Sequence, residues 1–289
     1  DARDAWEKFP SKLWDGRQEA AVSGHADDLF VDRGIDFLNR HKDGPFFLYI
    51  PLIATHFHIA APAEDVERFR GKFPEADPAN PLNATYAAMA TRLDANVGRV
   101  LKTLDDLGLA ENTLVVFTSD HGATFEVGNK GASDALDSNA PFRGQKRTLW
   151  EGGVRVPAAI RWPGHITPGT FSDQPIQLLD LFPTFLAAAG VPPSDRPSDL
   201  DGTDPLPHLT GKSALPDRTL FWEWRTEGSN QVAALRGDLK LVITNDGKPE
   251  LFNVVKDPAE RRDISAAYPG LTKELQESIK TWLATEVKF

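Results

Sequence analysis

Residues Thr113–Gly122, which read Thr-Leu-Val-Val-Phe-Thr-Ser-Asp-His-Gly, carry the strongest evidence for the fold predicted for this chain. Residues 113–118 form a continuous apolar and β-branched run, which is typical of a strand buried in a parallel sheet. Asp120 and His121 follow at once, so we expect a carboxylate and an imidazole at the carboxyl edge of the sheet, where open α/β folds place their active sites. Both groups can bind a metal ion, and cationic residues follow between positions 143 and 155. Metal ligands followed by cations favour an anionic ester as the substrate.

The composition is that of a globular chain with a large core. Of its 289 residues, 40% are hydrophobic and 26% are charged. A net charge of −10 argues against a nucleic-acid binder, which would carry a basic surface. No apolar run approaches the roughly 20 residues that cross a bilayer. The sequence contains no cysteine, which excludes disulfides, thiolate metal ligands and a cysteine nucleophile within it.

Hydrophobic periodicity predicts an α/β region over 1–216 and a different region over 217–289. In the first region, helical and strand-like patterns alternate. The expected helices are 26–41, 85–108 and 177–189, and the expected strands are 45–50, 113–118 and 154–162. The apolar runs over 45–50 and 113–118 indicate a mostly parallel central sheet flanked by helices.

The region 217–289 follows a connector that is rich in Pro, Asp and Ser. Short apolar runs separated by turns such as Asn245-Asp246-Gly247 predict an antiparallel meander. A helix over about 271–283 follows. We therefore expect a small antiparallel sheet with a helix, as a subdomain of its own.

Motifs in a fixed order carry a family resemblance. They are Pro45–Tyr49, Thr55-His56, Leu93–Gly98, Thr113–Gly122, Arg143–Lys146, Glu151–Pro157, Leu179–Thr184, Leu235–Leu241, Glu250–Phe252 and Asp257–Arg261. Together they resemble the later part of a type I sulfatase, a member of the alkaline phosphatase superfamily. The resemblance implies an alkaline-phosphatase-like α/β fold that is incomplete in this chain.

The earlier part of that family has no counterpart in this sequence. It carries a paired-Asp metal motif and the nucleophile, a Cys or Ser in a Cys/Ser-x-Pro-x-Arg motif that is converted to formylglycine. The segment Asn139–Arg143, Asn-Ala-Pro-Phe-Arg, has Asn where the nucleophile would stand, and we interpret it as a coincidental echo. The chain thus resembles about the last three-fifths of a sulfatase. It could be a gene fragment, one chain of a processed enzyme or a truncated paralogue. The missing N-terminal half is its expected partner.

The resemblance implies that Asp120 and His121 are half of a divalent-metal site. Ca²⁺ is expected rather than Mg²⁺, and both prefer oxygen ligands. Many sulfatases have Asn at the second position, so His121 either binds the metal or hydrogen-bonds the sulfate. For an isolated Asp-His pair, the alternative is a carboxylate that caps the next turn.

Lys146, His56 and Arg143 complete the site that the resemblance implies. Lys146 matches a catalytic lysine that contacts the sulfate and stabilises the developing charge. His56 matches a histidine that binds the sulfate or protonates the departing alcohol, which suits an ordinary histidine pKa. His56 and His58 could instead be zinc ligands, although no third ligand is evident. Arg143 is expected to be a cation on the substrate side of the site.

The function implied is that of a sulfuric ester hydrolase, similar to arylsulfatases, acting on a sulfated small molecule or carbohydrate. Without the nucleophile, this chain alone is expected to be inactive. The alternatives are a phosphodiesterase or phosphonate monoester hydrolase of the same superfamily, and a non-catalytic paralogue. The family resemblance implies a periplasmic or secreted protein. We predict that Asp120, His56 and Lys146 converge around one anion pocket.

Overall fold

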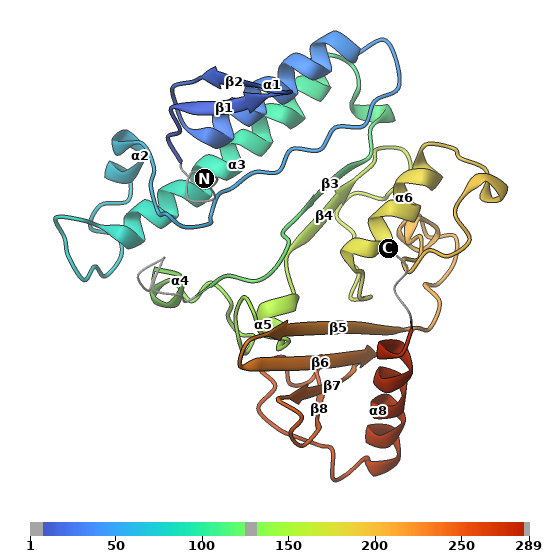
Figure 1. Cartoon of the computed structure of the whole chain (residues 1–289). Coiled ribbons are helices and arrows are strands. Elements are labelled where there is room, and N and C mark those ends of the chain that lie inside the picture. The colour runs from blue at the N-terminus through green and yellow to red at the C-terminus, as the bar shows by residue number, and fades with distance from the viewer. Residues whose placement is uncertain (1–7, 125–131, 286–289) are drawn as a thin grey trace. The chain divides into compact units, whose positions relative to one another are not determined.

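The computed structural model describes residues 8–124 and 132–285. They form two compact units (Figure 1). The first unit is drawn from residues 1–113 and 124–138, and the second from residues 114–123 and 139–289. In the described part of the chain, no helix is long and apolar enough to span a membrane.

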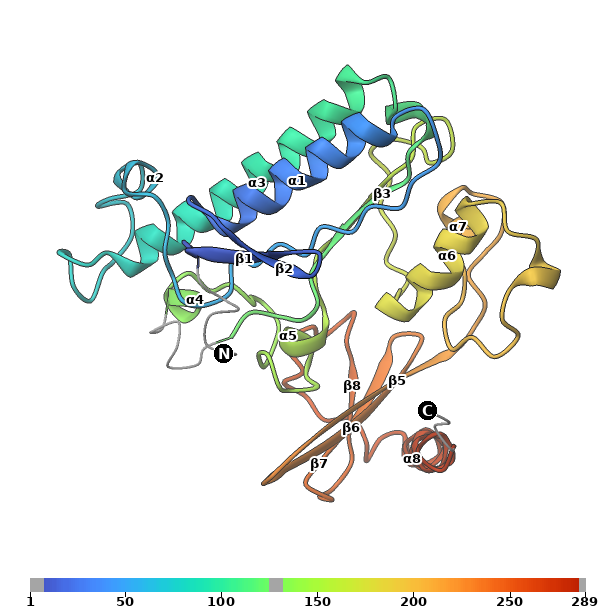
Figure 2. The same ribbon diagram turned by 45° about the horizontal axis from the view of Figure 1, so that its top comes forward.

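The first unit is built on two long helices, α1 (Ala26–His41) and α3 (Leu82–Asp106). They lie side by side in both views (Figure 1 and Figure 2). Apolar side chains at helical spacing are buried, among them Val31 and Leu38 of α1 and Met89 of α3. The other elements of this unit are β1 (Lys12–Asp15), β2 (Gln18–Ala21), α2 (Ala63–Glu67), η2 (Ala110–Asn112) and α4 (Ala132–Ala135).

The strand expected over 45–50 is wrong, because these residues belong to no sheet ladder. They still alternate in exposure: the side chains of Phe47 and Tyr49 are 69% and 75% exposed, and their neighbours are half-buried. Ile50 packs so closely on Gly34 of α1 that a Cβ there would lie 2.8 Å from Ile50 Cδ1. The hydrophobic pattern predicts that these residues are extended, but a strand also needs a neighbouring strand that hydrogen-bonds its main-chain N–H and C=O groups.

The second unit begins with β3 (Val115–Thr118), which pairs antiparallel with β4 (Ala158–Arg161). Every strand pair among the described residues is antiparallel, so the mostly parallel pairing is not found there. The burial expected for β3 is also wrong, since Phe117 is 38% exposed. An apolar run predicts a strand, but it specifies neither the direction of the partner nor what covers its faces.

Short helices follow β4 in this unit. The helix expected over 177–189 consists of η4 (Leu178–Asp180) and α6 (Leu181–Ala188). Asp180 is fully buried, and its carboxylate accepts hydrogen bonds from Arg218 and from the main-chain N–H of Thr203 at 2.8 Å. The remaining short helices are α5 (Glu151–Val154), η5 (Pro193–Asp195) and α7 (Leu206–Leu209).

The C-terminal sheet is the meander β5 (Thr219–Thr226), β6 (Ser229–Arg236), β7 (Leu239–Thr244) and β8 (Glu250–Asn253), all antiparallel. Helix α8 (Pro269–Leu283) packs on it, and Leu241, Leu251, Leu275 and Ile279 form the shared core. The mixed α/β class and the small antiparallel sheet with its helix are therefore confirmed. The division at 216/217 stays a prediction.

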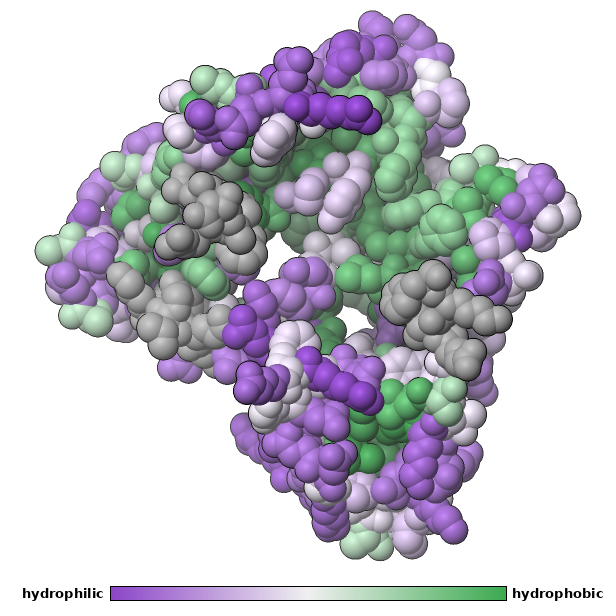
Figure 3. Space-filling model, in the orientation of Figure 1, coloured by the Kyte–Doolittle hydropathy of each residue, from purple (hydrophilic) through white to green (hydrophobic). Residues whose placement is uncertain are grey.

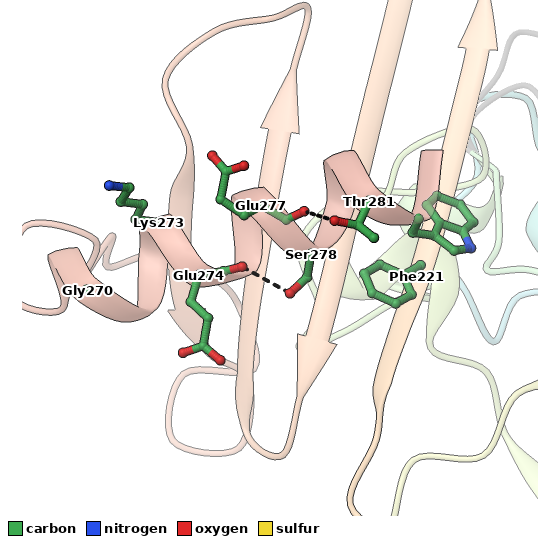
Figure 4. Close-up of a pocket in the computed structure, with 8 residues that line it drawn as sticks. Phe221, Gly270, Lys273, Glu274, Glu277, Ser278 and Thr281 are labelled. Carbon is green, nitrogen blue, oxygen red and sulfur yellow. Dashed lines mark hydrogen bonds between the residues drawn. The ribbon is translucent and has the colours of Figure 1, made fainter. Parts of the chain in front are cut away.

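Apolar side chains are exposed at the surface, and a groove lies along α8. Figure 3 shows hydrophobic residues at the surface beside hydrophilic ones. The groove, of about 740 Å³, lies where the ring of Phe221 stacks on Trp282 with centroids 5.2 Å apart (Figure 4). None of the residues that line this groove is a site residue predicted from the sequence.

Candidate functional site

Asp120 and His121 lie directly after β3, and their side chains meet. Nε2 of His121 is 3.2 Å from Oδ2 of Asp120, and Nδ1 of His121 is 3.0 Å from the carbonyl oxygen of Gly122. The tautomer with its proton on Nδ1 donates to that carbonyl and leaves Nε2 with a lone pair beside the carboxylate. This is the usual arrangement of a metal-binding histidine. The Asp120 side chain is 77% exposed, and the His121 side chain is 34% exposed.

The capping alternative also has support. Oδ1 of Asp120 accepts a hydrogen bond from the main-chain N–H of His121 at 3.0 Å and lies 3.4 Å from Oγ of Ser119. These contacts involve only Oδ1, whereas Oδ2 faces Nε2 of His121. The carboxylate therefore shapes its own turn and still presents an oxygen ligand.

Glycines join this turn to the loop that begins at Arg143. The N–H of Gly122 donates to the carbonyl of Gly153 at 3.0 Å, and the N–H of Gly152 donates to the carbonyl of Arg143 at 2.7 Å. A Cβ on Gly122 would lie 1.8 Å from the oxygen of Gly152, and a Cβ on Gly152 would lie 2.4 Å from the oxygen of Gly144. Main chain packs directly on main chain, which only glycine permits.

Lys146 is attached to the same structure. Its main-chain N–H donates to the carbonyl of Ala123 at 3.1 Å, and the residue is half-buried. The loop that carries the predicted catalytic ammonium is therefore bonded to the loop that carries Asp120 and His121. These loops lie in one compact unit, so their relative placement is part of the fold.

Arg143 makes structural contacts. Its guanidinium carbon lies 3.6 Å from the ring centre of Trp150, and Nη1 donates to the carbonyl of Glu260 at 3.1 Å. Arg143 also lines a cavity of about 480 Å³ with Phe142, Glu260 and Arg261. A guanidinium has five N–H donors, and these contacts do not use all of them. The predicted role of Arg143 in substrate binding therefore stays a prediction.

Sequence reasoning missed a buried charge network around Glu151. Arg155 Nη1 is 3.5 Å from Glu151, but Nζ of Lys240 is closer, at 2.8 Å. Lys240 also lies 3.3 Å from Glu260, whose carboxylate accepts the main-chain N–H of Glu151 at 2.7 Å. Burial raises the pKa of Glu260, although the charge of Lys240 opposes this. A lysine inside the apolar strand Leu239–Thr244 was the available signal.

His56 belongs to the other compact unit. Its Nδ1 is 2.6 Å from the carbonyl oxygen of Phe57, and its ring stacks on the Phe57 ring with centroids 4.4 Å apart. A proton on Nδ1 satisfies that carbonyl. The convergence of His56 with Asp120 and Lys146 stays a prediction.

The loop that carries His56 is held by buried charges. The Asp27 carboxylate is 1% exposed and accepts the main-chain N–H groups of Ile53 at 2.8 Å and Ala54 at 2.9 Å. The Lys8 ammonium donates to the carbonyl of Ile53 at 3.1 Å. Burial lowers the pKa of Lys8 to about 8, against the opposing charge of Asp27. Asp27 was not predicted, since an acidic residue in the first turn of a helix is ordinarily a solvated charge.

The donor set fits part of a cation site. Ca²⁺ takes about six to eight oxygen ligands, of which Asp120 supplies one, while His121 supplies a nitrogen. Within residues 8–124 and 132–285, no group of three or more His, Asp or Glu side chains is placed to hold a metal ion. Asp120 and His121 therefore fit a metal site that takes further ligands from elsewhere better than a site of their own. The zinc alternative at His56 and His58 also has no third ligand among these residues.

Known proteins match this chain over nearly its whole length. The sulfatase family model matches residues 3–191, and the model of the N-sulphoglucosamine sulphohydrolase C-terminal region matches residues 143–286. Steryl-sulfatase of Rattus norvegicus is 33% identical over 262 residues, which cover 80% of this chain and 43% of that protein. Human N-acetylgalactosamine-6-sulfatase is 37% identical over 237 residues, covering 81% and 40%.

A solved structure agrees with these matches. The crystal structure of Ps i-CgsB in complex with k-i-k-neocarrahexaose superposes with a TM-score of 0.81 at 27% identity. The superposition covers 94% of this chain and 57% of that one. The chain thus spans less than half the length of these two curated relatives.

Proposed function

Since this chain belongs to the sulfatase family, we propose that it is the later part of a sulfuric ester hydrolase and supplies one side of its metal and sulfate site. The observation that carries the proposal is the meeting of the Asp120 and His121 donor atoms, on a turn that is hydrogen-bonded to the Lys146 loop. A carboxylate, an imidazole and an ammonium on connected loops suit an anionic ester.

Asp120 and His121 would hold a divalent cation, Ca²⁺ rather than Mg²⁺, because Ca²⁺ accepts irregular ligand geometry. When bound, the cation would supply positive charge to the sulfate oxygens. Lys146 binds the sulfate and stabilises negative charge on the leaving oxygen. His56 donates a proton from Nε2 to the departing alcohol, while its Nδ1 faces the carbonyl of Phe57. Arg143 extends the cationic side toward the substrate.

The formylglycine nucleophile and the other metal ligands come from outside the 289 residues. Loss of a covalent nucleophile costs about 10⁶-fold in rate, so this chain alone has negligible activity. Exposed apolar side chains support a covering partner segment, the N-terminal half of the enzyme: Phe171 is 98% exposed, and Phe182 is 52% exposed. Sulfated carbohydrates or small sulfate esters are the proposed substrates, and a periplasmic or secreted location suits them.

The test compares the 289-residue chain with the same chain preceded by whatever its gene encodes upstream. Both are assayed with Ca²⁺ on 4-methylumbelliferyl sulfate and on a phosphonate monoester. We expect only the longer protein to act, with preference for the sulfate.

In the longer protein, Asp120→Asn should lower kcat by about 10³-fold, because a bound cation supplies several kcal/mol. The matched control is Asp36→Asn, at an exposed position of α1, which should leave kcat unchanged. Sulfate turnover that Asp120→Asn does not affect would overturn the assignment of the metal ligands. Preference for the phosphonate would favour the alternative hydrolase.

A further inference from the structure

Asn139, in the segment interpreted above as a coincidental echo, occupies the junction between the two loops of the candidate site. Its side chain is 8% exposed. Its Oδ1 accepts the main-chain N–H of Ala123 at 2.9 Å, and its Nδ2 donates to the carbonyls of Ala123 at 3.0 Å and Gly144 at 3.2 Å. One amide therefore pairs with both main-chain groups of Ala123 and also reaches the other loop.

The partners of Asn139 stand next to the proposed functional groups. Ala123 lies three positions after Asp120, and Gly144 lies two positions before Lys146. The carbonyl of Ala123 also accepts the main-chain N–H of Lys146 at 3.1 Å. The side-chain hydrogen bonds of Asn139 thus lead to the loop that carries Asp120 and to the loop that carries Lys146.

Only an amide satisfies this set of partners. An acceptor and two donor hydrogens are needed on one short side chain, which Asn supplies and Asp, Ser and Thr do not. Its oxygen is already engaged by Ala123, and the side chain is buried. Asn139 is therefore placed to orient other residues and not to touch a substrate.

We propose that Asn139 is a positioning residue that sets the relative placement of the Asp120–His121 turn and Lys146. Its effect on turnover rests on the proposed function. Its effect on the main chain does not. A misplacement of about 1 Å can cost about 10²-fold in rate, so a fault at this junction should appear in kcat.

The test uses Asn139→Asp in the protein as its gene encodes it. Asp keeps the shape and the acceptor for Ala123, but it replaces the amide donors with an oxygen that repels both carbonyls. The matched control is Asn112→Asp, the same change at an exposed residue of η2. Hydrogen exchange, followed by mass spectrometry of peptides that contain Ala123 and Lys146, measures the main chain directly.

We expect Asn139→Asp to speed exchange at these amides at least about tenfold, with exchange in β6 and β7 unchanged. On 4-methylumbelliferyl sulfate, kcat should fall about 10- to 100-fold with KM changed less than about threefold. The Ca²⁺ concentration for half-maximal rate should rise. Asn112→Asp should change none of these.

Unchanged exchange at Ala123 and Lys146 would overturn the proposal. Faster exchange with unchanged kcat would overturn its functional part. If the unsubstituted protein hydrolyses no sulfate ester, the proposed function fails, while the exchange measurement still decides the placement. Should Asn139→Asp not unfold cooperatively, Asn139→Ser, which keeps one hydroxyl, is measured in the same way.

Discussion

Replacing Lys240 with Met should destabilise this protein strongly. The Lys240 ammonium is fully buried, 2.8 Å from Oε1 of Glu151 and 3.3 Å from Oε1 of Glu260. At an effective dielectric constant of about 20, these attractions are worth about 6 and about 5 kcal/mol. Desolvation of the charges cancels much of this, so removing one partner should cost about 3–5 kcal/mol in the free energy of unfolding. Met matches the lysine stem in length, so little cavity forms.

The cost should depend on pH through Glu260. Burial raises the pKa of Glu260 above its ordinary 4.5, so the folded state holds that proton more firmly than the unfolded chain. Binding of this proton stabilises the folded state fully below pH 4.5, and the stabilisation is lost as the pH rises through the pKa of Glu260 in the folded state. Protonation also relieves the repulsion left by Lys240→Met. The cost should therefore be smaller at acidic than at neutral pH.

Urea unfolding followed by far-ultraviolet circular dichroism measures these free energies. The matched control is Lys102→Met, which breaks an exposed pair in which Lys102 is 73% and Asp106 60% exposed, and should cost less than about 1 kcal/mol. Adding Glu260→Gln to Lys240→Met should restore part of the loss, because it removes one unpaired buried carboxylate. Equal costs for Lys240→Met and Lys102→Met would refute the reasoning.

Other perturbations test the remaining structure. Gly122→Ala should destabilise the protein by more than about 1 kcal/mol and weaken Ca²⁺ binding, since its Cβ would lie 1.8 Å from the oxygen of Gly152. The control is Gly270→Ala, because there is open space around Gly270. Equal melting temperatures for the two variants would contradict this prediction. Asp27→Asn should cost about 1–3 kcal/mol, because a charged acceptor of two N–H groups is lost, and should shift the NMR resonances of the Ile53 and Ala54 amides. Unshifted amide resonances would show that Asp27 does not hold that loop. The pKa of Lys8 is lowered to about 8 from 10.5, so the unfolded state binds more protons between these values and stability should rise with pH there; a Lys8→Met variant should lose this rise in unfolding titrations.

The interpretation of Asn139–Arg143 shows where local patterns mislead. The segment was compared with the nucleophile motif of sulfatases, so Asn139 was judged only as a nucleophile. Because an amide cannot act as one, the match was interpreted as a coincidence. Its structural role depends on Ala123 and Gly144, whose main-chain groups it pairs with. No spacing in the sequence reports that an amide will meet two loops at once.

Features that depend on neighbours along the chain could be predicted from the sequence alone. Helical stripes predicted α1 and α3, turn residues predicted the β5–β8 meander, and the Ser-Asp-His-Gly stretch placed a carboxylate and an imidazole after β3. Tertiary structure decided the partners: the antiparallel β3–β4 pair, the extended 45–50 segment without a ladder, and the Lys240 network. Periodicity and propensity arise from interactions within a few residues, whereas pairing and burial depend on groups that are distant in sequence and meet only when the chain folds.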